Sequence, residues 1–124
     1  MNSYPSPEIV VQRQLDAYNA RDLDALMRTY ADDAQQFEHP GKLVASGHEQ
    51  IRARMAQRLQ EPNLHARLIK RAVMGNVVID YEDVTRTFAD GCGMLELVAI
   101  YEVREGKIQT ASVVAGARTM DGAE

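Results

Sequence analysis

The second half of the chain contains four strand-like segments that are separated by very short turn sequences. They cover about residues 64–74, 77–88, 94–104 and 107–117. The separators are Gly75-Asn76, residues 90–93 and Glu105-Gly106, whose residue types tolerate the positive φ angles of tight turns. Short connections join antiparallel strands, because parallel strands need a crossover of a dozen or more residues. The pattern therefore predicts an antiparallel meander, and this constrains the fold most strongly.

Several of these segments are apolar on both faces. Leu95, Leu97 and Ala99 share one face of the third segment, and Val98 and Ile100 share the other. A sheet with one face in water would alternate more strictly between apolar and polar residues. We therefore expect helices to cover one face and a second copy of the chain to cover the other.

The first half of the chain carries helical patterns. Ser6 followed by Pro7 is typical of a helix start, because proline at the first helical position lacks only an N–H that would be unpaired anyway. Val11, Leu15 and Tyr18 then share one face of a helix that runs to about residue 20.

Two further helices are predicted before residue 62. Asp22 is expected to cap the second helix, and its apolar stripe consists of Leu23, Leu26, Met27 and Tyr30. Ser46 and Glu49 have the spacing of a capping box at the start of the third helix. Between these helices, residues 34–40 form a short extended segment in which Phe37 and His39 share one face.

Length and composition restrict the class of protein. A chain of 124 residues fits one domain, here residues 1–124 with a core at about 7–118. The net charge of -4 argues against a dedicated nucleic-acid-binding protein. The single cysteine, Cys92, excludes an internal disulfide, and neither a membrane-spanning run nor a signal peptide is recognisable. We expect a cytoplasmic protein without membrane association.

Four stretches together resemble the NTF2-like (cystatin-like α+β) superfamily, and in particular its SnoaL-like and ketosteroid-isomerase-like branch. They are residues 20–26 (ARDLDAL), 30–34 (YADDA), 46–51 (SGHEQI) and 101–108 (YEVREGKI). The resemblance implies an α+β fold in which three N-terminal helices pack on a curved, mostly antiparallel meander sheet. It also implies a cone with an apolar pocket, and a homodimer formed through the outer face of the sheet.

The ketosteroid isomerase mechanism makes demands that this sequence does not meet. It needs a carboxylate base, a tyrosine and a protonated aspartic acid. The resemblance places the base at His39 and the other two groups near Gln14 and Ala99, so isomerase activity of that kind is not expected. His39 is still a candidate proton carrier, since an imidazole exchanges protons near neutral pH. Alternatively, it only hydrogen-bonds a neighbour at the strand end.

Residues 77–86 are unusually polar for a strand in the middle of a sheet. Counted back from the turn at residue 90, Tyr81, Asp83 and Thr85 are expected to face the pocket. Asp83 would then orient and charge the imidazole of His39. A register error of one residue would turn Glu82 inward instead, and the sequence leaves this choice open.

The candidate site therefore combines a catalytic pair with a pocket wall. The pair is His39 and Asp83, and the wall residues are Tyr18, Phe37, Tyr81, Thr85, Ala99 and Tyr101. Each wall residue has the alternative of being ordinary core. No cofactor or metal is expected, because the three histidines lack metal-ligand spacing.

One segment of the chain is strongly basic. Between residues 42 and 71 it contains seven of the 14 basic residues and only two acids, Glu49 and Glu61. Such a segment can bind an anionic ligand or a phosphate backbone, but no aromatic residues for base stacking are interleaved with it. A solvated face paired with the acidic remainder of the chain is the preferred interpretation.

These observations favour a dimeric pocket protein that binds a small apolar, polyketide-like or steroid-like molecule. Cofactor-free acid–base chemistry of an isomerase, cyclase or dehydratase type is the leading hypothesis. A non-catalytic module that binds a ligand or a partner is the alternative.

Overall fold

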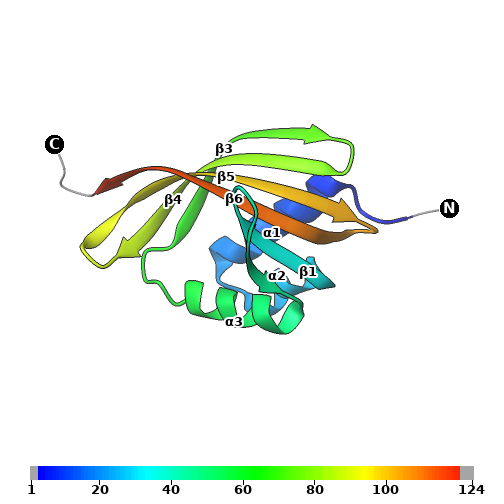
Figure 1. The fold of residues 1–124 in the computed structure, drawn as a ribbon, viewed down its shortest axis with the longest axis horizontal. Helices are drawn as coiled ribbons and strands as arrows, with labels where there is room; N and C mark the ends of the chain where they lie inside the picture. Colours follow the sequence, from blue (N-terminus) through cyan, green and yellow to red (C-terminus); the bar gives the residue numbers. More distant parts are fainter. Residues whose placement is uncertain (1–2, 121–124) are drawn as a thin grey trace.

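The structure is a computed structural model that describes residues 3–120, folded into three helices and six strands (Figure 1). In chain order, the elements are α1 (Pro7–Ala20), α2 (Leu23–Arg28), β1 (Tyr30–Glu38), β2 (Lys42–Ser46), α3 (His48–Arg58), β3 (His65–Met74), β4 (Val77–Phe88), β5 (Gly91–Arg104) and β6 (Lys107–Met120). This confirms the expected α+β class, with N-terminal helices on a curved, mostly antiparallel sheet.

Two of the three predicted helix caps are confirmed. The side chain of Ser6 accepts a hydrogen bond from the Ile9 N–H, and that of Asp22 accepts one from the Ala25 N–H. The predicted capping box at Ser46 is wrong, because Gly47 is the N-cap of α3 and has no side chain to contribute. Instead, Gln50 Oε1 accepts a hydrogen bond from the Ser46 N–H at 2.8 Å.

The six strands form one sheet in the order β2-β1-β6-β5-β4-β3. Strands β3 to β6 pair antiparallel through tight turns, which confirms the predicted meander. Strand β1 lies parallel to β6, and β2 pairs antiparallel with β1. The hydrophobic pattern misses β2 because Ala45 is its one buried residue. Tyr30, expected in the second helix, is the first residue of β1 and is paired with Ile108.

Helix α1 packs across the inner face of the sheet and is fastened to the edge strand β3. The side-chain amide of Asn19 donates to the carbonyl of Ala66 and its oxygen accepts from the Ala66 N–H, both at 2.8 Å. This pair of bonds satisfies backbone groups of β3 as a neighbouring strand would. Helices α1 and α3 both lie on the inner side of the curved sheet (Figure 1).

The loop between α3 and β3 is held by one arginine. Arg21 ends α1 in the left-handed conformation, with φ of 59°. Its guanidinium donates hydrogen bonds to the carbonyls of Leu59, Glu61, Pro62 and Leu64. Because the guanidinium offers five N–H donors, it can satisfy several loop carbonyls at once, and this fixes where α3 ends above the sheet.

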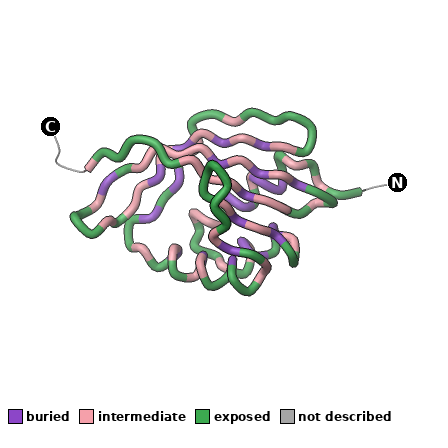
Figure 2. The backbone as a smooth tube through the Cα atoms, in the orientation of Figure 1, coloured by how far each residue is buried: buried purple, intermediate pink, exposed green. Residues whose placement is uncertain are grey.

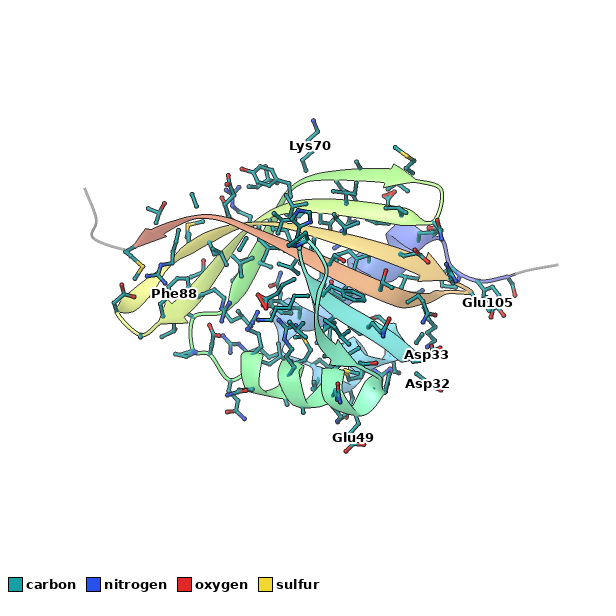
Figure 3. All side chains as sticks on the ribbon, viewed as in Figure 1. Asp32, Asp33, Glu49, Lys70, Phe88 and Glu105 are labelled. Carbon is teal, nitrogen blue, oxygen red and sulfur yellow. The ribbon has the colours of Figure 1, made fainter. Side chains whose placement is uncertain are left out.

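The two faces of the sheet differ in burial (Figure 2). On the inner face, Val78, Asp80, Glu82 and Val84 of β4 are almost fully buried, whereas the residues between them are partly exposed. On the outer side, Lys70 of β3 extends away from the sheet (Figure 3). The core therefore lies between the inner face and the helices, and the outer face is not covered within the described part of the chain.

Candidate functional site

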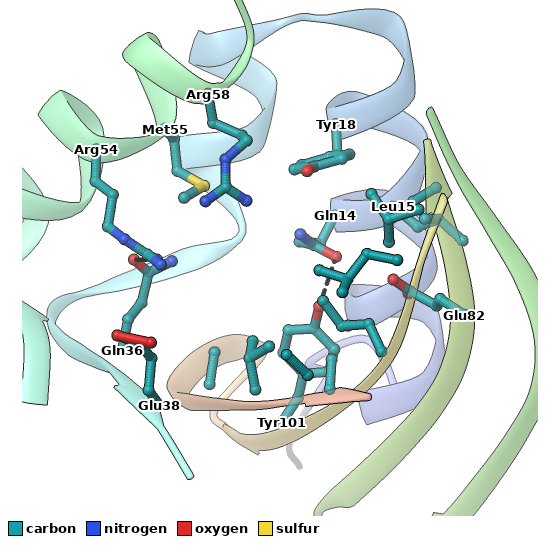
Figure 4. A pocket seen from close by; sticks show the side chains of 18 of the residues that line it. Gln14, Leu15, Tyr18, Gln36, Glu38, Arg54, Met55, Arg58, Glu82 and Tyr101 are labelled. Atoms are coloured by element: carbon teal, nitrogen blue, oxygen red, sulfur yellow. Dashed lines mark hydrogen bonds between the residues drawn. The ribbon is translucent and has the colours of Figure 1, made fainter. Parts of the chain in front are cut away.

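A cavity of about 220 Å³ lies between α1, α3 and the inner face of the sheet (Figure 4). Apolar side chains from α1, α3 and the central strands form much of its wall. The polar groups that determine its chemistry come from five elements, and they are Gln14, Tyr18, Gln36, Arg54, Glu82 and Tyr101. Such a mixture of apolar wall and few converging polar groups is typical of small-molecule sites.

Glu82 is the most unusual group on this wall. It faces the cavity from the middle of β4 and is only 5% exposed. Its carboxyl group forms no hydrogen bond or ion pair with another described residue. Every fully enclosed side-chain nitrogen or oxygen in the described residues has a hydrogen-bond partner, so the Glu82 oxygens must be open to the cavity. Buried carboxylates are otherwise paired or hydrogen-bonded, since an isolated buried charge is very costly.

The environment of Glu82 favours its neutral form. Burial, and to a smaller extent the negative charge of Asp80, raise the pKa of the Glu82 carboxyl from 4.5 to about 7, against the opposing charge of Arg71. A carboxyl group with this pKa exchanges a proton near neutral pH, as a general acid or base must.

A tyrosine and a glutamine form a second polar group at the cavity. The Tyr101 hydroxyl donates a hydrogen bond to Gln14 Oε1 at 3.3 Å, and both residues are buried. Burial raises the pKa of Tyr101 well above its ordinary value, and the nearby Tyr30 and Glu82 act in the same direction. The hydroxyl therefore stays protonated at neutral pH and remains a donor.

The wall contributed by α3 is positively charged. Arg54 donates a hydrogen bond to Gln36 Oε1 at 2.8 Å, and the Gln36 amide donates to the Tyr30 hydroxyl at 3.3 Å. Burial raises the pKa of Tyr30 to about 12. This chain of bonds holds the Arg54 guanidinium at the cavity wall, opposite Glu82 (Figure 4).

Two other arginines at the cavity, Arg58 and Arg86, share one carboxylate. The Arg86 guanidinium donates to both oxygens of Glu61 at 2.7–3.1 Å, and Arg58 Nε lies 3.6 Å from the same group. Burial alone would raise the pKa of Glu61, but hydrogen bonds from Arg86 and from the Thr87 N–H outweigh it and lower the pKa. Glu61 thus compensates one of these two positive charges within the protein.

Asp80, two residues before Glu82, is also compensated. Arg71 binds both of its carboxylate oxygens, with distances of 2.7 Å and 2.9 Å, and also donates to Gln12 Oε1 of α1 at 2.8 Å. The side chain of Asp80 is fully buried. The bidentate pair lies beside the cavity rather than on its wall.

Four of the predicted site residues line the cavity. Tyr18, Phe37 and Ala99 line it from α1, β1 and β5, and Tyr101 lines it two residues beyond Ala99. Their predicted role in ligand binding stays a prediction at this point.

The expected orientation of β4 is wrong by one residue. Tyr81, Asp83 and Thr85 are not on the cavity wall, because Glu82 and its alternate neighbours face inward. Asp83 instead forms an ion pair at 2.7 Å with Arg67, which is 62% exposed. The error arises because β4 is polar on both faces, so that alternation does not distinguish them.

His39 is not brought into the cavity either. It is exposed in the turn after β1, where its backbone N–H donates a hydrogen bond to the carbonyl of Val113. Glu38, expected on the opposite face, lines the cavity instead. The β1–β2 pairing shifts register between Gln36 and Phe37, and such an irregularity changes which side chains point inward. The proposed pairing of His39 with Asp83 is therefore not assembled at this cavity.

Two polar residues of the cavity wall, Gln14 and Arg54, were not predicted as site residues, although the sequence contains a signal for each. Gln14 lies three residues after Val11 and four before Tyr18, on the buried stripe of α1. Arg54 follows Ile51 by three residues, on the buried side of α3. Polar residues on an otherwise apolar stripe are candidates for a site, since a buried polar group needs a partner.

Neither a cluster of metal-binding side chains nor a membrane-spanning helix is found in residues 3–120. No group of three or more His, Cys, Asp or Glu side chains in this range is placed to hold a metal ion. The His48 imidazole contacts the backbone of α2, since its Nε2 lies 2.9 Å from the Met27 carbonyl oxygen. None of the helices in this range combines the length and the apolar character needed to span a membrane.

A second hollow, of about 690 Å³, lies between the N-terminal segment, α1, α2 and the β5–β6 turn. All of its charged side chains are exposed. It contains no buried titratable group comparable to Glu82, so the chemistry is concentrated in the cavity over the sheet.

Solved structures with the same fold are numerous. An uncharacterised cystatin-fold protein from Novosphingobium aromaticivorans is 27% identical, with a TM-score of 0.79 over 88% of this chain and 97% of that one. An LEH-like epoxide hydrolase of M. tuberculosis is 13% identical, with a TM-score of 0.78 over 89% and 82%. A candidate SnoaL-like polyketide cyclase from Jannaschia sp. CCS1 is 18% identical, with a TM-score of 0.76 over 88% and 84%.

Sequence comparison identifies the family directly. Among proteins of curated function, none matches this chain. The sequence profile of the SnoaL-like domain, in contrast, matches residues 11–111, from the first turns of α1 to the middle of β6. The matched range includes the polar residues of the cavity wall described above. The chain therefore belongs to the SnoaL-like domain family.

Proposed function

We propose that this protein binds a small, mostly apolar molecule in the cavity and that Glu82 carries a proton in cofactor-free acid–base chemistry on it. The observation that carries the proposal is the buried Glu82 carboxyl, which faces the cavity and has no partner among the described residues. A proton donor or acceptor that is left unpaired at a cavity wall is available to a bound molecule.

The neighbouring groups support a division of roles. Glu82, with a pKa of about 7, is populated in both protonation states near neutral pH. Gln14, whose amide oxygen accepts from Tyr101, lies at the same cavity and can donate an amide N–H to an oxygen atom of the substrate. Proton transfer at one position and stabilisation of an oxygen at another are what isomerisation, cyclisation or dehydration of a carbonyl compound requires.

The cavity favours a small ligand. Its volume of about 220 Å³ lies below the 300–1,000 Å³ typical of drug-sized ligands. Of the ligand classes that the sequence admits, this supports a small apolar molecule over a steroid. The solved cyclase and epoxide hydrolase structures share the fold at low identity, so the substrate class rests on the cavity itself.

Ligand binding is tested by native mass spectrometry of the purified protein, which is expected to reveal a co-purified small molecule. The Ala99→Phe variant should abolish this adduct, because Ala99 is on the cavity wall and is 2% exposed. Ala72→Phe, at an exposed position of β3, is the matched control. An adduct that survives Ala99→Phe would place the binding site elsewhere.

Catalysis is tested on the molecule so identified. Glu82→Gln should lower turnover by about 100-fold or more, because it removes the proton carrier and keeps the shape of the side chain. Glu38→Gln is the control, since Glu38 is also on the wall but is exposed. Binding without any turnover would identify the protein as a non-catalytic ligand-binding module.

The outer face of the sheet supports a further part of the proposal, a homodimer. Ile79 pairs with Ile100, and Val98 pairs with Val114, so four half-buried apolar residues adjoin one another on this face. Light scattering at micromolar concentration should give twice the mass of the chain, and Val98→Glu should convert it to a monomer. A cytoplasmic location and independence of cofactors and nucleic acid stay predictions from the sequence.

A further inference from the structure

Arg54 is the one arginine on the cavity wall without a carboxylate partner in the described chain. Arg58 and Arg86 both face Glu61, but no carboxylate oxygen lies within 4.0 Å of the Arg54 guanidinium. Glu38, the nearby acid on the wall, lies 4.0 Å from Lys42 instead. The bond to Gln36 uses one of five N–H donors.

The surroundings of Arg54 make the lack of a carboxylate partner significant. Burial, together with the positive charge of Arg58, lowers the pKa of the Arg54 guanidinium. The side chain is half-buried and extends from α3 into the cavity, across from Glu82 (Figure 4). Glu38 acts on this cation only from beyond ion-pair distance. A half-buried cation without an ion-pair partner is stabilised when a bound molecule supplies one.

The chemistry of the wall restricts that anion. A carboxylate matches the planar fork of a guanidinium and would give Arg54 the ion-pair partner that it lacks. A phosphate dianion would bring a second negative charge into a cavity that Glu38 and Glu82 also line. The rest of a ligand would contact apolar residues such as Leu97 and Ala99.

We propose that the ligand of this cavity is a small apolar monocarboxylate, whose carboxylate binds Arg54 while its apolar body extends toward Glu82. The inference rests on the proposed function and specifies its substrate class. It also assigns a role to Arg54, which belongs to the basic segment at residues 42–71. The sequence pattern favoured a solvated face for that segment.

The test compares phenylacetate with phenylacetamide, two probes of nearly the same shape that differ in charge. Calorimetric titration of the full chain should show phenylacetate binding at least tenfold more tightly, because a hydrogen-bonded ion pair at a half-buried site is lost with the amide. Arg54→Gln should remove this preference. Arg52→Gln, on the exposed side of the same helix, makes the same charge change and should keep it.

A measurement on the unaltered protein complements the variants. Phenylacetate should shift the NMR signals of the Arg54 guanidinium, and phenylacetamide should shift them much less. Equal affinity for the two probes, or an equal loss in Arg54→Gln and Arg52→Gln, would overturn the inference and leave the cavity as a site for neutral molecules. Absence of saturable binding by either probe would overturn it as well, whereas a co-purified neutral molecule would leave the proposed function intact.

Discussion

Two regions on the inner face of β4 carry buried acids, and they differ in how the charge is compensated. At Asp80, the guanidinium of Arg71 binds both carboxylate oxygens and is itself held by Gln12. At Glu82, two residues further on, the carboxyl faces the cavity and has no partner in the described chain. Because alternate residues share a face of a strand, the two acids have the same orientation and differ only in their surroundings.

The difference distinguishes a structural role from a chemical one. A buried acid with a bidentate partner is satisfied, and it contributes to the fold by fastening β3, β4 and α1 together. A buried acid without a partner is kept neutral over much of the pH range and can exchange a proton with a ligand. The same contrast separates Arg86, which faces Glu61, from Arg54, which donates only to an amide.

The largest effect on the free energy of unfolding is expected when the partner of Asp80 is removed. Arg71→Met should lower the free energy of unfolding by about 3–5 kcal/mol at pH 7, because it leaves Asp80 charged and buried without a partner. Urea unfolding measures this loss. The double variant Arg71→Met, Asp80→Leu should recover most of the stability, and a loss below about 1 kcal/mol in the single variant would contradict the assignment.

At Glu82, a substitution is expected to raise the free energy of unfolding rather than lower it. Its pKa is about 7 in the folded state against an ordinary 4.5, so the protein binds this proton more tightly when folded. The corresponding stability is complete below pH 4.5 and is lost as the pH rises to about 7. Glu82→Gln should therefore become more stable than the unaltered protein across this range, by up to roughly 3 kcal/mol.

Unfolding free energies measured between pH 4 and 8 provide the readout for Glu82→Gln. Glu38→Gln serves as the matched control, because Glu38 is exposed and its removal should produce no comparable trend with pH. A difference between the Glu82→Gln and unaltered proteins that does not vary with pH would show that Glu82 is not held neutral by its surroundings.

A smaller effect is expected at Tyr101. Tyr101→Phe should cost about 1 kcal/mol, because the buried Gln14 oxygen loses its hydrogen bond. Tyr81 also donates a hydrogen bond, to Glu96, but on the outer side of the sheet where water can replace it. Thermal unfolding should therefore show a smaller change for Tyr81→Phe, and the reverse order would mean that the inner face is accessible to water.

The smallest effect is expected at Asp83, the neighbour of Glu82 on the other face. Asp83→Asn should change the unfolding free energy by less than about 1 kcal/mol, because its partner Arg67 is 62% exposed. Turnover of the ligand identified above should be unchanged. A strong loss of turnover would return Asp83 to the site and contradict the orientation of β4.

Much of the fold could be predicted from local patterns. Gly75-Asn76 and Glu105-Gly106 favour tight turns through their own backbone preferences, so the meander could be predicted from them. Ser6 and Asp22 cap helices through bonds to residues three positions away, and these too are local. Strand β2 could not be predicted, because it depends on pairing with β1 rather than on its own alternation.

The site was less predictable because the sides of β4 are chemically alike. Residues 80, 82 and 86 on one side are as polar as 81, 83 and 85 on the other. The partners that allow charges on the inner side come from distant elements, with Arg71 on β3 and Glu61 after α3. The position of His39 before Pro40 favoured a histidine mechanism, but the chain turns there and leaves the imidazole exposed.

The sequence by itself determined the elements of this protein other than β2, their order and its membership of the SnoaL-like family, because periodicity, caps and turns act over a few residues. Only the tertiary structure decided which acid of β4 faces the cavity and which arginine of α3 lacks a partner. Those properties depend on the register of the sheet and on the packing of α1 and α3 over it. Both are set by contacts between residues far apart in the chain, and they determine the chemistry available in the cavity.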